Sequence, residues 1–373
     1  MFRRFHFFSP HILQLAAFPY VPLKNTKAAI LAALKRFHPM KTLLLLLALT
    51  SPLLAEGKKF TLTARASEID PGTKEHPEID YVFARKGKPA DNQLAMVDTR
   101  VKPSGYLVIW LMEPKPELFN RLNSYGHHAM QVTYPREWFA KMDKLRKEGD
   151  DDHFSGIRLE AATGEDHTKL IDIPKPDGLM ERSYQFVKYL DQKHPKGNWK
   201  QFLSRDGKGL DWEKVILSGA SHGSTTAARL AKEIKVARVV MLSGPRDQTE
   251  KWQGLKSATP PERFFGFTHT GDAGWRGHHY CRSWLMLDLH KFGPIVNVGE
   301  SKPPYGNTRR LISTEASIKD PQRAHSASTP GGASPKGTDG KYLYEDVWKY
   351  LFTHPVGDTG TAVKPEARCR EDF

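Results

Sequence analysis

Short apolar runs alternate with helical segments from about residue 105 onward, and this alternation most constrains the fold. The run GYLVIWLM at 105–112 is almost continuously apolar and is bounded by Gly105 and Pro114, which is typical of a strand buried on both faces of a parallel sheet. Further strands are expected at 59–64, 127–135, 212–219, 236–244, 263–272, 293–300 and 309–316, and helices at 116–126, 177–195 and 342–352. This order predicts an α/β fold with a mostly parallel central sheet and helices on both faces.

The charge of the chain depends strongly on its N-terminus. The whole sequence carries a formal net charge of +14, but residues 1–55 contain seven Lys or Arg and no Asp or Glu. The remainder has 49 basic and 42 acidic residues, a net charge of +7, and no long basic run. A mildly basic surface of this kind gives no support for a nucleic-acid partner.

The segment 40–55 has the pattern of a secretory signal peptide. Met40-Lys41 supplies a charged start, the apolar run covers 43–49, and Ala55 precedes a polar mature sequence. We therefore expect an exported protein, periplasmic or extracellular, with 1–39 as an over-extended reading frame and 56–373 as one domain. The run is short for a permanent span, although an N-terminal membrane anchor is the alternative interpretation. No permanent membrane span is expected once the signal is removed.

Two cysteines, Cys281 and Cys369, are present in the sequence. In an oxidising compartment they can pair, and the alternative is two free thiols.

Ser221 lies in the pattern Gly219-Ala220-Ser221-His222-Gly223, between the apolar run VIL and a helix-prone stretch. A nucleophile on a tight strand-turn-helix needs small residues on both sides, because the helix packs close to the neighbouring strands. The helix start places backbone N–H groups near the reacting oxygen, and that of His222 is the first candidate oxyanion donor. A connection of small residues without chemistry is the alternative. The sequence lacks a Gly-x-Gly-x-x-Gly pattern or a Gly-Lys-Ser/Thr triplet here, which argues against a nucleotide site.

A serine nucleophile needs a base and an orienting acid, in the chain order Ser, Asp or Glu, His on this architecture. Asp272 ends the stretch 263–272, directly after RFFGFTHTG, and His325 follows the last expected strand and precedes the closing helix. Asp272 as a turn former and His325 as a surface histidine are the alternatives. Asp247, after the strand at 236–244, is a rival acid.

A cluster of His269, His278, His279, Asp272 and Cys281 also raises the question of a metal. Its spacing matches no standard zinc signature, so no metal is expected, and a metal-dependent site around His278 and His279 is only a weaker alternative.

These motifs together resemble the α/β-hydrolase superfamily, and the resemblance covers roughly residues 100–355. It rests on the stretches GYLVIWLM, VILSGASHGSTTAARLA, VVMLSGPRD, RFFGFTHTGD and RRLISTE with the later AHSAS. More narrowly, the sequence is similar to a group of exported bacterial hydrolases whose natural substrates are not established. The resemblance implies Ser221 as nucleophile, Asp272 as acid and His325 as base, with no cofactor.

The loop after the first core strand departs from the family pattern. Many members have glycines there that supply a second oxyanion N–H, whereas this chain has Met112-Glu113-Pro114-Lys115. Pro114 has no N–H, so Glu113 is the candidate second donor.

The predicted function is hydrolysis of an ester-like bond in a small-molecule or polymer-borne substrate through an acyl-enzyme. A peptidase or amidase with the same triad, and a non-catalytic binding protein on this fold, are the alternatives. An excursion at about 136–178 is expected to shape the pocket.

Overall fold

The computed structural model describes residues 57–133, 138–150, 152–247 and 251–370. By its internal contacts the chain divides into two units, Met1–Glu56 and Gly57–Phe373. The expected N-terminal extension at 1–39 and the signal peptide at 40–55 lie outside the described residues.

One large sheet dominates the described residues, with the strand order β1-β4-β6-β5-β7-β8-β9-β11-β10. Every pair from β6 to β10 is parallel, while β4 runs antiparallel to both β1 and β6. The strands are β1 (Lys59–Arg65), β4 (Asn92–Asp98), β5 (Leu107–Trp110), β6 (His128–Gln131), β7 (Val215–Ala220), β8 (Arg238–Leu242), β9 (Phe264–His269), β10 (Ile295–Asn297) and β11 (Arg310–Ser313). A separate small hairpin pairs β2 (Ala84–Arg85) with β3 (Lys88–Pro89). The predicted α/β class with a mostly parallel sheet is confirmed.

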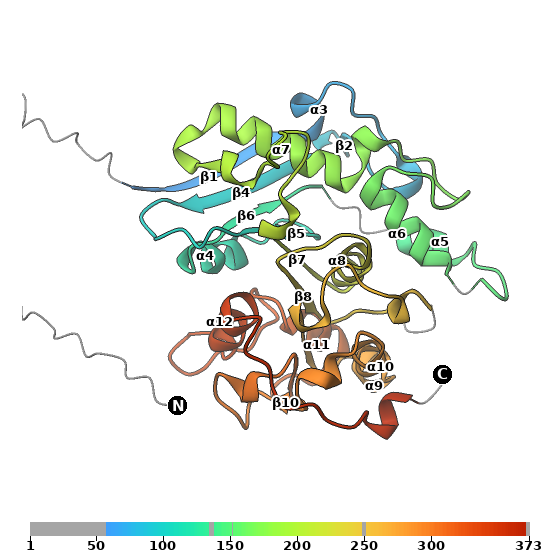
Figure 1. Cartoon of the computed structure of the whole chain (residues 1–373), viewed down its shortest axis with the longest axis vertical. Helices are drawn as coiled ribbons and strands as arrows, with labels where there is room; N and C mark the ends of the chain where they lie inside the picture. The colour runs from blue at the N-terminus through green and yellow to red at the C-terminus, as the bar shows by residue number, and fades with distance from the viewer. Residues whose placement is uncertain (1–56, 134–137, 151, 248–250, 371–373) are drawn as a thin grey trace, which may run out of the picture. The chain divides into compact units, whose positions relative to one another are not determined.

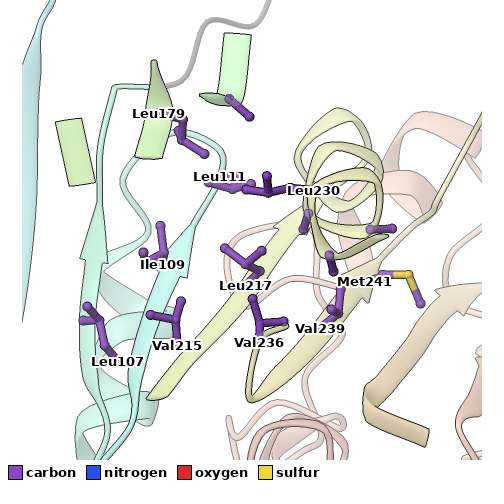
Figure 2. Close-up of a cluster of buried hydrophobic side chains, with 14 of the residues drawn as sticks. Leu107, Ile109, Leu111, Leu179, Val215, Leu217, Leu230, Val236, Val239 and Met241 are labelled. Atoms are coloured by element: carbon purple, nitrogen blue, oxygen red, sulfur yellow. The ribbon is translucent and has the colours of Figure 1, made fainter. Parts of the chain in front are cut away.

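Successive side chains of the core strands point to opposite faces of the sheet, and both faces are covered. On β7, Val215 and Leu217 belong to one buried cluster and Ile216 to another, which is why the run reads as continuously apolar. Figure 2 shows the first cluster, where side chains of β5, β7 and β8 meet Leu230 and Leu179 from two helices.

Helices lie on both faces of the sheet (Figure 1). Buried residues of α7, α8 and α10 belong to the first cluster, and buried residues of α4 and α12 to the second. The helices are α3 (Ala66–Ile69), α4 (Pro116–Ser124), α5 (Trp138–Asp143), α6 (His153–Thr163), α7 (Leu179–Lys193), α8 (His222–Glu233), α9 (Ala273–Arg276), α10 (His279–Met286), α11 (Pro321–Ala327) and α12 (Glu345–Thr353).

The segment between β6 and α7 carries α5 and α6, and α6 packs against α8, the helix that follows the Ser221 turn. Its buried aromatic and aliphatic side chains form a separate cluster with Ile79 and Tyr81 from the N-terminal part of the domain. Helices α5 and α6 therefore bring side chains toward the start of α8.

A disulfide joins Cys281 on α10 to Cys369 in the C-terminal segment, with their Cα atoms 5.2 Å apart. Both cysteines are buried. Within the described ranges, none of the helices combines the length and the apolar character that a membrane crossing requires.

Candidate functional site

Ser221 occupies a strained turn between β7 and α8. Its backbone has φ 53° and ψ −114°, a combination that side-chain-bearing residues rarely adopt. Its N–H donates to the Leu242 carbonyl at 2.9 Å, and its carbonyl accepts from the hydroxyls of Ser224 and Thr225. The turn is thus held by bonds on both sides of the strained residue, at the carboxyl end of a central strand.

The two glycines that flank Ser221 are required by close packing. A Cβ on Gly223 would overlap the carbonyl oxygen of Leu111, and a Cβ on Gly219 would overlap the backbone of Gly223. The first turn of α8 therefore lies directly against the ends of β5 and β7, as the steric argument from the sequence predicts.

Asp272 and His325 are brought together from segments 53 residues apart. The Nδ1 atom of His325 lies 2.8 Å from Oδ2 of Asp272, whose side chain is almost fully buried, while the His325 side chain is 26% exposed. Because a carboxylate only accepts hydrogen bonds, Nδ1 carries a proton, which in the neutral imidazole leaves Nε2 as the acceptor. Asp272 also caps α9, since its Oδ1 accepts the N–H of Gly274 at 2.8 Å. Asp272 therefore both forms a turn and contacts the histidine.

Consecutive residues at the end of β8 link Ser221 to His325. Leu242 accepts the N–H of Ser221, and the hydroxyl of Ser243 donates to the His325 carbonyl at 2.7 Å. Ser243 also contacts the hydroxyl of Ser328 at 2.8 Å. The serine turn and helix α11, which carries His325, are therefore fixed to the same strand end.

His222 is the first residue of α8, so its backbone N–H lies at the positive end of the helix dipole. The ring of Phe139 packs on its imidazole, and the Nη1 atom of Arg158 lies 3.4 Å from both its Nδ1 and its carbonyl oxygen. Burial, and then the charges of Arg158, Arg246 and His325, hold the pKa of His222 well below its usual value. Its side chain is consequently neutral near pH 7.

Glu113 lies in the turn after β5, close to Leu111, the residue that Gly223 packs on. Its carbonyl accepts the indole N–H of Trp110 at 2.9 Å, which fixes the turn. Its part as the second oxyanion donor stays a prediction.

Asp247, the rival acid, is engaged elsewhere. Its carboxylate receives Nε and Nη2 of Arg158 at 2.7 and 3.2 Å, and both side chains are 1% exposed. Arg158 also donates to Thr226 on α8. The structure thus gives His325 the carboxylate of Asp272 and gives Asp247 a buried arginine.

Two neighbours of the site were not assigned a catalytic part by sequence reasoning. Arg158 lies in the excursion, where no motif singles it out. Tyr280 donates its hydroxyl to Oδ2 of Asp272 at 3.1 Å, and the same hydroxyl lies 3.4 Å from Nδ1 of His325. Burial raises the pKa of Tyr280 well above its usual value, so the phenol keeps its proton.

The weaker metal interpretation finds no cluster in the described part of the chain, where no three His, Cys, Asp or Glu side chains are grouped to hold an ion. Cys281, one member of the sequence cluster, is bonded to Cys369.

The Arg158–Asp247 pair gives a stability prediction. Asp247→Asn leaves a buried guanidinium without its counter-charge, so the free energy of unfolding should fall by about 3–5 kcal/mol. Asp288→Asn is the matched control, because its ion pair with Lys291 is 43% and 56% exposed and should contribute less than about 1 kcal/mol. Urea unfolding measures both, and equal losses would show that the buried pair contributes nothing special.

Comparisons with known proteins give structural likeness only. No protein-family model matches the sequence, and no curated protein matches it. Esterase B from Lactobacillus rhamnosis is 11% identical, with 83% of this chain and 91% of that chain covered and a TM-score of 0.28. S-formylglutathione hydrolase from Staphylococcus aureus is 11% identical, covering 59% and 80%, with a TM-score of 0.31. A hyperthermophilic esterase from the archaeon Pyrobaculum calidifontis is 16% identical, covering 62% and 61%, with a TM-score of 0.22.

The fold itself is established by the strands and the turn described above. A sheet whose parallel strands β6 to β10 follow an antiparallel β4, and a strained serine between a central strand and its helix, are the marks of one architecture. The chain has the fold of the α/β-hydrolase superfamily.

Proposed function

We propose that the protein is a serine hydrolase that cleaves ester bonds through Ser221, His325 and Asp272. The observation that carries the proposal is the 2.8 Å contact of His325 Nδ1 with the buried Asp272 carboxylate, at the strand ends that also hold the strained Ser221. A base oriented by an acid and a serine on a strained turn are the parts that nucleophilic acyl transfer needs.

In the proposed mechanism, Nε2 of His325 takes the Ser221 proton while the serine oxygen attacks the ester carbonyl. Asp272 keeps the imidazole in the tautomer with Nδ1 protonated and stabilises its cation. The backbone N–H of His222, and a second donor in the turn at Glu113, stabilise the tetrahedral oxyanion, each by about 3 kcal/mol. His325 then protonates the leaving alcohol, and water releases the acyl group by the same steps. An amide or peptide substrate would use the same residues.

A non-catalytic binding protein is the second candidate. The observation in its favour is the turn at 112–115, in which Pro114 has no N–H to offer an oxyanion and the neighbouring residue, Glu113, carries an acidic side chain.

We also propose that the protein is exported by means of the segment 40–55. N-terminal sequencing of the mature protein should then give a chain that starts near Glu56, and a mature chain that starts near Met1 would contradict export by this route.

Ser221 gives the most direct test of the enzyme. A fluorophosphonate probe should label the native protein, and Ser221→Ala should lose the label because the probe reacts only with an activated serine. Ser326→Ala, which removes an exposed hydroxyl next to His325, is the matched control and should label normally. A folded native protein that takes no label would favour the binding protein.

Tyr280 gives a test of the acid. Tyr280→Phe removes one donor from the Asp272 carboxylate, so kcat for a neutral aryl ester should fall about tenfold with little change in KM, since the phenol is fully buried behind that carboxylate. Tyr344→Phe removes another buried tyrosine hydroxyl, bonded to Ser313, and should leave kcat unchanged. Equal effects of the two substitutions would assign Tyr280 a purely structural part.

A further inference from the structure

Arg246 is a half-buried cation next to the proposed base. It lies one residue before Asp247 and lines a cavity of about 120 Å³ together with Asp272, Ala273, Pro321, Gln322 and His325. Within the described residues 57–133, 138–150, 152–247 and 251–370, its guanidinium has no hydrogen bond or ion pair. A guanidinium held away from bulk water without a carboxylate is a natural anion-binding group.

The backbone that presents Arg246 is held in place from three elements. Its N–H donates to the hydroxyl of Thr225 on α8 at 3.0 Å. Its carbonyl accepts from the side-chain amide of Gln253 and from the hydroxyl of Ser283 on α10, the latter at 3.4 Å. The side chain therefore starts from a fixed point beside the site, as a recognition residue should.

Arg246 differs from the other charged side chains at the site, because each of those has a partner of opposite charge or several hydrogen bonds. Arg158 is paired with Asp247, and the Asp272 carboxylate is shared among Gly274, Tyr280 and His325. Asp272 lines the cavity, but its negative charge is therefore largely compensated by these three partners.

The positive charge of Arg246 affects the pKa values of two nearby histidines. It lowers the pKa values of His222 and His279, in both cases after the larger effect of burial. His279 is consequently neutral near pH 7 and adds no second cation. The cavity thus offers one positive charge in a planar fork.

We propose that Arg246 binds a carboxylate carried by the alcohol portion of the ester substrate. The proposal rests on the proposed function, because it takes His325 as the group that protonates the leaving alcohol. The leaving oxygen must then lie over the imidazole, and Arg246 lines the same cavity as that imidazole. One guanidinium matches one carboxylate in charge and in bidentate geometry, whereas a phosphate dianion calls for more than one cation.

Two small esters with one acyl group test this assignment: 4-acetoxybenzoate, with an anionic leaving group, and the neutral 4-acetoxybenzamide. Both form the same acetyl-enzyme, so kcat/KM isolates the step in which the leaving group is bound and expelled. Arg246→Gln should lower kcat/KM for the benzoate about tenfold to a hundredfold and leave the benzamide nearly unchanged. For the benzoate, Arg246→Lys, which keeps the charge and loses the planar fork, should give a kcat/KM between those of the native protein and Arg246→Gln.

Arg276→Gln is the matched control, since Arg276 is an exposed arginine on α9, four residues from Asp272. Arg276→Gln should leave kcat/KM unchanged for both esters. Because each variant is compared with the native protein on both esters, the different intrinsic reactivities of the two leaving groups cancel.

The outcomes separate this inference from the proposed function. Equal losses on both esters, or no loss on either, would overturn the anion site while leaving the hydrolase intact. Native protein that hydrolyses neither ester and takes no fluorophosphonate label would overturn the proposed function and, with it, this assignment.

Discussion

The contact of Gly223 with the carbonyl of Leu111 sets the geometry on which the rest of the site depends. It allows the first turn of α8 to lie against the end of β5, directly after the strained backbone of Ser221. Strain of this kind persists only where neighbouring bonds over-determine it, and here Leu242, Ser224 and Thr225 supply them. A rigid strand end then presents a side chain that a flexible loop could not hold in place.

The two buried carboxylates of the site, Asp247 and Asp272, are both compensated. Asp247 is satisfied by Arg158, and Asp272 by an amide, a phenol and an imidazole, so each buried carboxylate has its partners. The Arg158 pair also ties helix α6 of the excursion to the loop after β8 and to α8. The excursion is therefore connected to the scaffold by a buried ion pair as well as by apolar packing.

The sequence was sufficient to predict the fold class and the meeting of Asp272 with His325, because buried parallel strands leave continuous apolar runs and the hydrolase chain order puts the acid and the base after particular strands. It did not reveal β4, since Asn92–Asp98 pairs antiparallel near the sheet edge and its apolar centre is flanked by polar residues. Helix α11 was missed as well, because its apolar contacts are few. Two further partners, Arg158 of Asp247 and Tyr280 of Asp272, could not be predicted either. Arg158 and Tyr280 contact these carboxylates through tertiary packing, which no local sequence pattern indicates.

The disulfide has a topological consequence for the proposed base. Cys281 and Cys369 close a covalent ring that contains β10, β11, α11 and α12, so His325 lies inside the ring while Ser221 and Asp272 lie outside it. A protease that cut one peptide bond inside the ring would leave both fragments attached to the same molecule. The exposed, glycine-rich stretch at 337–340 could then be nicked without releasing the segment that carries the histidine. Outside a cell, where disulfides persist, such a ring would let the protein lose a backbone bond and keep its parts together.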